Sequence, residues 1–71
     1  MKNESREKQI YDFIVEYQAL HNYPPTIKEI AEHFGTSTGN TWRYLTILRA
    51  RRLIDWRYKR PRTIRVIRPF E

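Results

Sequence analysis

Most cationic side chains of this chain lie in its second half, and nearly all of those in the second half are arginines. Residues 1–35 contain four basic and six acidic residues, a net charge of −2, whereas residues 36–71 contain ten basic and two acidic residues, a net charge of +8. Nine of those ten are arginine, whose planar guanidinium suits phosphate oxygens and the edge of guanine. This distribution favours a nucleic-acid partner over the alternative, a basic face kept for solubility.

Side chains able to read base edges follow Ser37, at the start of a helix predicted over residues 37–51. The first turns of a recognition helix face base edges in the major groove of DNA. Asn40 would pair with adenine and Arg43 with guanine; the alternative is that Asn40 caps the helix locally and Arg43 binds a phosphate. The outward residues predicted to contact bases are Thr38, Gly39, Asn40, Trp42 and Arg43.

Trp42 is the large apolar side chain in this outward set. An outward indole would contact a thymine methyl group or a partner protein, whereas the alternative is an indole folded back onto the domain. The sequence leaves these interpretations open.

Two further groups are predicted to bind the DNA backbone. Phosphate contacts from polar side chains and helix N-termini fix the position of a protein on the duplex. A cationic turn over residues 59–62 is predicted to insert into or beside the minor groove, where narrow A·T segments attract arginine; a solvated turn is the alternative. The predicted backbone contacts are Thr26, Lys28, Ser37, Thr46 and Arg49, and those of the turn are Lys59, Arg60 and Arg62.

Residues for catalysis or metal binding form no pattern in this sequence. His21 and His33 stand apart from any Asp, Glu or Cys at ligand spacing, the chain has no cysteine, and its two glycines make no phosphate-binding loop. We therefore expect a protein that is not an enzyme and that has no cofactor or metal site.

Three amphipathic segments are expected to position these residues. Their predicted starts are Ser5, Thr26 with Glu29 as a capping box, and Ser37. The first segment should end near residues 21–22 and the second at Gly35. Apolar spacings of three and four predict the buried stripes. These are Ile10, Phe13, Ile14, Tyr17 and Leu20, then Ile30, Ala31 and Phe34, then Thr41, Tyr44 or Leu45, and Leu48.

After Leu53 the apolar period changes to two. Alternation over residues 54–59 and a β-branched run over residues 63–67 predict two strands, and Pro61 lies in the turn between them. A lone hairpin is marginally stable, so this one should pack on the helices through Ile54, Trp56, Ile64 and Val66. The predicted fold class is mainly α with a small β-hairpin: three helices plus a two-stranded antiparallel wing, a winged helix-turn-helix.

Length and composition predict one domain over residues 1–71, with 1–4 and 68–71 frayed. No apolar run approaches the roughly 20 residues of a membrane span. The absence of cysteine fits a reducing compartment. We therefore expect a cytoplasmic, nucleoid-associated protein that makes no membrane contact.

Three motifs in this order resemble the N-terminal DNA-binding domain of the LexA repressors. They are Y-P-P-T-x-x-E-I-A-x-x-F-G over residues 23–35, L-x-x-L in a Ser-capped helix, and R-R-L-I-D before a strand ending I-R-V-I. The resemblance covers Arg6 to Ile67 and implies the winged fold and DNA binding. The turn before Ser37 is one residue shorter than in LexA, and Trp42 and Arg43 stand where LexA has glutamates, which implies a different base preference. From the length of the sequence we expect no counterpart of LexA's self-cleaving, dimerising domain.

These observations together predict a double-stranded DNA-binding protein, a small transcriptional repressor or other regulator. We expect it either to form a homodimer on DNA or to bind DNA with modest affinity. One alternative is a mobile-element or replication protein that binds DNA with weak sequence specificity. Another is a winged-helix module for protein–protein interaction, with Trp42 in the interface.

Overall fold

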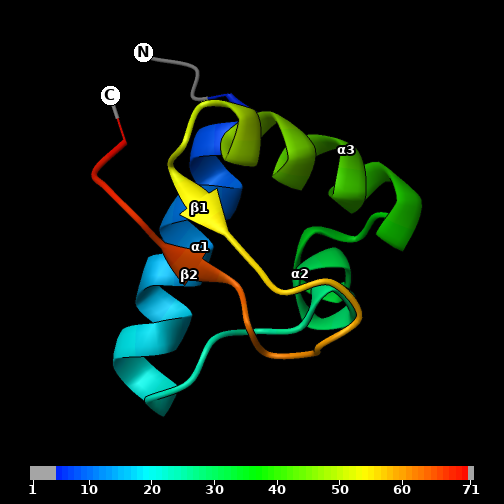
Figure 1. The fold of residues 1–71 in the computed structure, drawn as a ribbon. Helices are drawn as coiled ribbons and strands as arrows, with labels where there is room; N and C mark the ends of the chain where they lie inside the picture. The colour runs from blue at the N-terminus through cyan, green and yellow to red at the C-terminus, as the bar shows by residue number, and fades with distance from the viewer. Residues whose placement is uncertain (1–4, 71) are drawn as a thin grey trace, which may run out of the picture.

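The computed structural model describes residues 5–70 as three helices followed by a small antiparallel hairpin (Figure 1). In chain order these are α1 (Arg6–His21), α2 (Ile27–Phe34), α3 (Thr38–Ala50), β1 (Ile54–Asp55) and β2 (Arg65–Val66). In the hairpin, Ile54 pairs with Val66 and Asp55 with Arg65. This architecture confirms the predicted winged helix-turn-helix.

Local hydrogen bonds fix the ends of α2 and the start of α3. The Thr26 hydroxyl accepts the backbone N–H of Glu29 at 3.1 Å, and the Glu29 carboxylate accepts that of Thr26 at 2.9 Å, so the predicted capping box forms. Gly35 ends α2 at φ 65°, a conformation that glycine adopts without steric cost. Two residues later the Ser37 hydroxyl accepts the N–H of Asn40 at 3.0 Å and begins α3. The short turn therefore sets the direction in which α3 leaves α2.

The core lies where α1 and α3 face each other and the hairpin closes one side. Burial confirms most of the predicted stripes, including Thr41, whose hydroxyl donates to the Ser37 carbonyl at 2.9 Å. The buried apolar side chains are Ile10, Tyr11, Ile14, Ile30, Ala31, Leu45, Leu48, Leu53, Ile54 and Ile64. Leu20, predicted to extend the stripe of α1, is instead 77% exposed, because the last turn of α1 extends past the elements that pack on it (Figure 1).

The strands are shorter than predicted, two residues each. Lys59 and Arg62 have positive φ, 59° and 56°, and Pro61 has no N–H, so the backbone between the strands cannot form a ladder. Residues 56–63 instead form a loop, which we call the wing loop. Val66, predicted to pack on the helices, stays 37% exposed, while Ile64 is buried.

The segment after β2 runs along α1. The Ile67 N–H donates to the Leu53 carbonyl at 2.8 Å, and the Tyr11 hydroxyl donates to the Arg68 carbonyl at 2.9 Å. The Phe70 ring packs on Tyr11 with 5.5 Å between ring centroids. Residues 68–70, expected to fray, thus contact the first helix, while residues 1–4 and 71 lie outside the described residues.

Candidate nucleic-acid interface

The first turns of α3 present the predicted base-contacting residues on one open face. Thr38, Gly39 and Arg43 are exposed and Asn40 is half-buried. Asn40 Nδ2 donates to Thr36 Oγ1 at 2.9 Å, and Arg43 Nη1 lies 3.5 Å from Asn40 Oδ1. Asn40 therefore has local partners, as its alternative interpretation required, yet it stays beside Arg43 on the outward side of the helix.

Trp42 both packs on the domain and stays open to solvent. Its ring lies 5.2 Å from that of Trp56, at an interplanar angle of 59°, and its side chain is 41% exposed. The Arg49 guanidinium lies 4.5 Å from the Trp56 ring, and Arg49 Nε is 3.0 Å from Asp55 Oδ1. Each interpretation of Trp42 is therefore partly correct: the indole packs on Trp56, and it also remains accessible to solvent.

The predicted backbone contacts differ in what their side chains already bind. Lys28 and Thr46 are exposed on the surfaces of α2 and α3. Thr26 and Ser37 cap these helices, so their hydroxyls each accept a backbone N–H. Arg49 is the member of the set whose charge is paired within the protein, with Asp55.

One threonine holds the wing loop in its turned conformation. Thr63 Oγ1 accepts the Arg57 N–H at 2.9 Å and donates to the Arg60 carbonyl at 2.8 Å. These bonds replace the ladder that the sequence pattern predicted. Lys59 and Arg60 are exposed at the tip, with Lys59 Nζ 5.5 Å from the Tyr58 ring.

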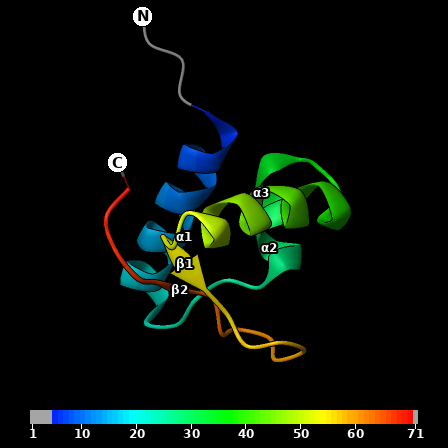
Figure 2. The same ribbon diagram turned by 45° about the horizontal axis from the view of Figure 1, so that its top comes forward.

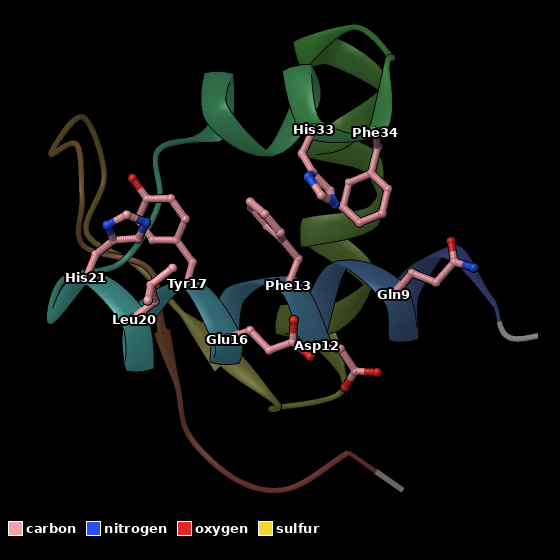
Figure 3. A pocket seen from close by; sticks show the side chains of 9 residues that line it. All are labelled: Gln9, Asp12, Phe13, Glu16, Tyr17, Leu20, His21, His33 and Phe34. Carbon is pink, nitrogen blue, oxygen red and sulfur yellow. The ribbon is translucent and has the colours of Figure 1, made fainter.

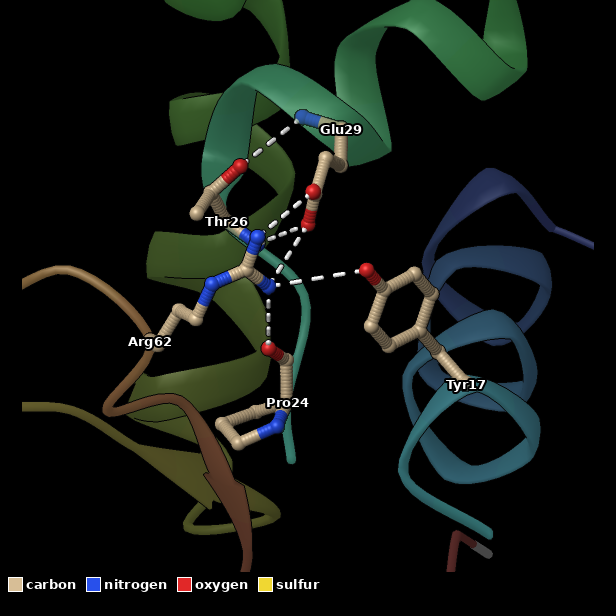
Figure 4. A network of polar contacts seen from close by, with 5 residues as sticks. All are labelled: Tyr17, Pro24, Thr26, Glu29 and Arg62. Atoms are coloured by element: carbon tan, nitrogen blue, oxygen red, sulfur yellow. Dashed lines mark hydrogen bonds and ion pairs between the residues drawn. The ribbon is translucent and has the colours of Figure 1, made fainter. Parts of the chain in front are cut away.

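Arg62 turns back from the wing loop and binds the body of the domain (Figure 4). Its two terminal nitrogens meet the Glu29 carboxylate at 3.0 and 2.7 Å, and Nη1 also donates to the Pro24 carbonyl at 3.1 Å. The guanidinium carbon lies 4.7 Å from the centre of the Tyr23 ring, and the Tyr17 hydroxyl is 3.5 Å from Nη1. These contacts, which we call the Arg62 clasp, join the wing loop to the start of α2.

The Arg62 clasp changes the titration of Glu29. Hydrogen bonds from the Arg62 guanidinium, followed by the one from the Thr26 backbone N–H, lower the pKa of Glu29 from 4.5 to about 2. The same carboxylate raises the pKa of Arg62. Glu29 therefore stays ionised at neutral pH while it serves both the capping box and the clasp.

The structure brings the predicted reading helix and the wing loop to the same side of the domain. Both project in one direction from the helical body in two views (Figures 1 and 2). Side chains from the two also line one cleft, which includes Thr26, Trp42, Lys59, Arg60 and Arg62. The residues predicted separately from α2, α3 and the turn are therefore neighbours in space.

Sequence reasoning missed two contributors to this surface. Trp56 was predicted as a packing residue only, but it supports Trp42, and Arg57 lines the same cleft. The alternation of residues 54–59 placed Trp56 on one face of a strand. Nothing in that local pattern pointed to an indole 14 positions earlier on α3.

The two histidines lie apart from this interface, in an aromatic cavity between α1 and α2 (Figure 3). The His33 ring stacks on Phe13 with 4.2 Å between centroids, and the His21 ring lies 4.1 Å from that of Tyr17. Among residues 5–70 no three His, Cys, Asp or Glu side chains are grouped so as to hold a metal ion. Both histidines are exposed at the surface, and each ring packs against an aromatic side chain of α1.

Fold and site together define a winged helix-turn-helix domain with a cationic wing. The family model for the LexA DNA binding domain matches residues 2–63. The chain belongs to this family, which confirms the resemblance in the sequence motifs.

Curated LexA repressors from three bacteria align with nearly the whole chain. The Koribacter versatilis protein is 34% identical over 65 residues, 90% of this chain. Those of Pseudothermotoga lettingae and Acetivibrio thermocellus are 36% and 39% identical, each over 94% of it. The aligned regions are 31%, 34% and 33% of these relatives, so the chain spans about a third of their length. Within the part of the chain that the structure describes, no helix has the length and apolar character to cross a membrane.

Proposed function

We propose that this chain binds double-stranded DNA as a transcriptional repressor or other small regulator. The observation that carries the proposal is the placement of the first turns of α3 and the cationic wing loop on one side of the domain. The half of the chain that contributes both elements has a net charge of +8. Membership in the LexA DNA-binding domain family supports the same conclusion.

In this proposal α3 lies in the major groove and reads base edges. Arg43 donates a bidentate pair to guanine and Asn40 pairs with adenine, each supplying about 1–3 kcal/mol of discrimination. The hydrogen bond from Asn40 to Thr36 orients the amide before DNA arrives. The remaining contacts to base edges come from Thr38, Gly39 and Trp42.

The wing loop and the helix ends hold the duplex by its backbone. Lys59 and Arg60 contact phosphates or enter the minor groove, and Arg62 supports them because its clasp fixes the loop against α2. Backbone contacts elsewhere come from Thr26, Lys28, Ser37, Thr46 and Arg49. If about six phosphates are neutralised, the logarithm of affinity falls with the logarithm of salt concentration with a slope near −5.

Two copies bind together on DNA in this proposal. A single small module buries about 600–1,000 Å² on DNA, which limits its affinity. We place the protein in the cytoplasm at the nucleoid and assign it no enzymatic activity, cofactor or membrane partner.

Selection of bound duplexes from a random pool, followed by anisotropy titration over a range of salt concentrations, tests the function. We expect an enriched sequence, a clear preference over random duplex and a slope near −5. Sedimentation of the complex gives the number of copies on each duplex. Affinity that is weak and equal for all duplexes, with no enriched sequence, would contradict a sequence-reading regulator.

A further inference from the structure

A narrow cleft separates α3 from the wing loop, and its interior is apolar. Its volume is about 170 Å³. The apolar lining comes from the start of α2 and the residue pair before it, from α3, and from the segment between the two strands: Pro25, Ile27, Trp42, Trp56, Pro61 and Ile64. Arg57, Lys59 and Arg60 also line it, and all three are exposed. An apolar floor with a cationic rim suits a ligand that combines a C–H surface with flanking anions.

The proposed function determines which part of the DNA crosses this cleft. If α3 lies in the major groove and the wing loop lies against the neighbouring minor groove, one strand of the duplex must pass between them. That strand is a chain of sugars joined by phosphates. The cleft lies between the two elements, so the strand that divides the grooves passes over it.

We infer that the cleft seats one deoxyribose of this strand, with the phosphates on either side bound by Arg57, Lys59 and Arg60. This inference rests on the proposed function and assigns a role to an apolar surface that phosphate contacts alone do not explain. The sugar packs its C–H face on the paired indoles of Trp42 and Trp56. Arg49, held by Asp55, covers Trp56 and braces the pair.

The same geometry makes the seat selective for DNA over RNA. A 2′-hydroxyl buried here would need a hydrogen-bond partner, and burial without one is costly. Both threonine hydroxyls that line the cleft already accept a backbone N–H within the protein. Thr26 Oγ1 accepts the Glu29 N–H, and Thr63 Oγ1 bonds to Arg57 and to Arg60. The Arg62 guanidinium is held by Glu29 and Pro24.

The test is a ribonucleotide scan of a duplex that the wild-type chain binds. A single ribonucleotide replaces one deoxyribonucleotide at a time, and anisotropy gives the affinity of each duplex. We expect one position in each bound site to lose about tenfold in affinity, with neighbouring positions nearly unchanged. In Trp42→Ala, which opens the floor, the penalty at that position should shrink to about twofold or less.

Tyr58→Ala is the matched control, because Tyr58 is an aromatic of the same loop that is 82% exposed and does not line the cleft. This variant should keep the full ribonucleotide penalty. The chain has two tryptophans and both line the cleft, so duplex binding should also change tryptophan emission.

Three results would overturn the inference. The first is a ribonucleotide scan in which no position loses affinity, although the protein binds the duplex and Arg60→Ala weakens that binding. This result would leave the proposed function intact. Another is a Trp42→Ala variant that loses sequence preference but keeps the ribonucleotide penalty, which would make Trp42 a base reader only. The third is tighter binding, with stronger quenching, by single-stranded oligothymidine than by duplex, which would indicate base stacking. If no duplex binds at all, the proposed function fails as well.

Discussion

The first turns of α3 and the wing loop are both predicted to meet DNA, but they are held in place in different ways. In α3 the contacts that position Asn40 and Arg43 are within a few residues: the Ser37 cap, the Thr36 hydroxyl and the helix itself. The wing loop is positioned from far along the chain. Arg62 binds Tyr17, Pro24 and Glu29, which are 45, 38 and 33 residues away.

This difference indicates how a domain of this size presents two contact surfaces. A helix needs only a cap and an apolar face, so its outward residues follow from its start. A loop with two left-handed residues and a proline has no repeating hydrogen bonds to hold it. The clasp and the Thr63 bonds supply the order that a ladder would otherwise provide.

The largest expected effect concerns sequence discrimination by α3. Arg43→Ala and Asn40→Ala should each reduce the ratio of selected to random duplex affinity by about 1–3 kcal/mol, roughly fivefold to a hundredfold, because a bidentate base contact is lost. Competition binding with both duplexes measures this ratio. If the ratio is unchanged in both variants, α3 does not read bases through these side chains.

Removing charge from the wing tip should weaken binding to every duplex to the same extent. Lys59→Ala and Arg60→Ala should each make the salt slope shallower by about 1, because one phosphate contact is lost, and leave the ratio of selected to random affinity unchanged. Anisotropy titrations at several salt concentrations give the slope. A change in sequence preference with an unchanged slope would instead assign these residues to base readout.

Loss of the Arg62 clasp should change the stability of the domain more than the salt dependence of DNA binding. For Arg60 we expect the reverse. Arg62→Ala should lower Tm by several degrees, because it removes a bidentate pair and leaves the Pro24 carbonyl without its donor. Arg60→Ala is the control and should leave Tm nearly unchanged. Circular dichroism melts compare the two, and equal melting temperatures would show that the clasp does not hold the loop.

Glu29 should make this stabilisation depend on pH. Its folded pKa of about 2 lies below the ordinary 4.5, so its ionised form stabilises the fold above pH 4.5. That contribution declines as pH falls from 4.5 toward 2. Glu29→Gln should therefore show a smaller loss of Tm over this interval than the wild type. Parallel slopes in the two proteins would contradict the assignment.

The smallest expected effects come from removing the capping serines of α3 and α1, and DNA binding should distinguish the two. Ser37→Ala and Ser5→Ala should each cost about 1 kcal/mol of stability, because each removes one capping hydrogen bond. Only Ser37→Ala should also weaken DNA binding, since Ser37 begins the helix that faces DNA. Urea unfolding and anisotropy on the same samples test this, and equal DNA affinity in the two variants would count against a role for the start of α3.

Particular residues show how far the sequence alone predicted this fold. Capping and spacing predicted the three helices to within about a residue, and burial followed for Ile10, Ile30 and Leu45. The same patterns failed for Leu20 and Val66, which are exposed. Periodicity states which residues share a face, but neighbouring elements decide whether that face is covered.

The candidate site was likewise predictable from the sequence only in part. Arginine enrichment and the Ser37 cap were enough to predict the outward set on α3, and its exposed positions agree with that expectation. Three arginines that a count of charges treats alike differ in the structure. All three are exposed, but Arg49 is paired with Asp55 and lies over Trp56, and Arg62 is paired with Glu29, whereas Arg60 lies at the tip of the wing loop.

The amino-acid sequence by itself determined the helices, their caps and the concentration of positive charge, because these depend on residues a few positions apart. Tertiary structure decided the course of the wing loop, the pairing of Trp42 with Trp56 and the capture of Arg62. Those contacts join segments distant in the chain, so they form only when the core brings α1, α2, α3 and the hairpin together.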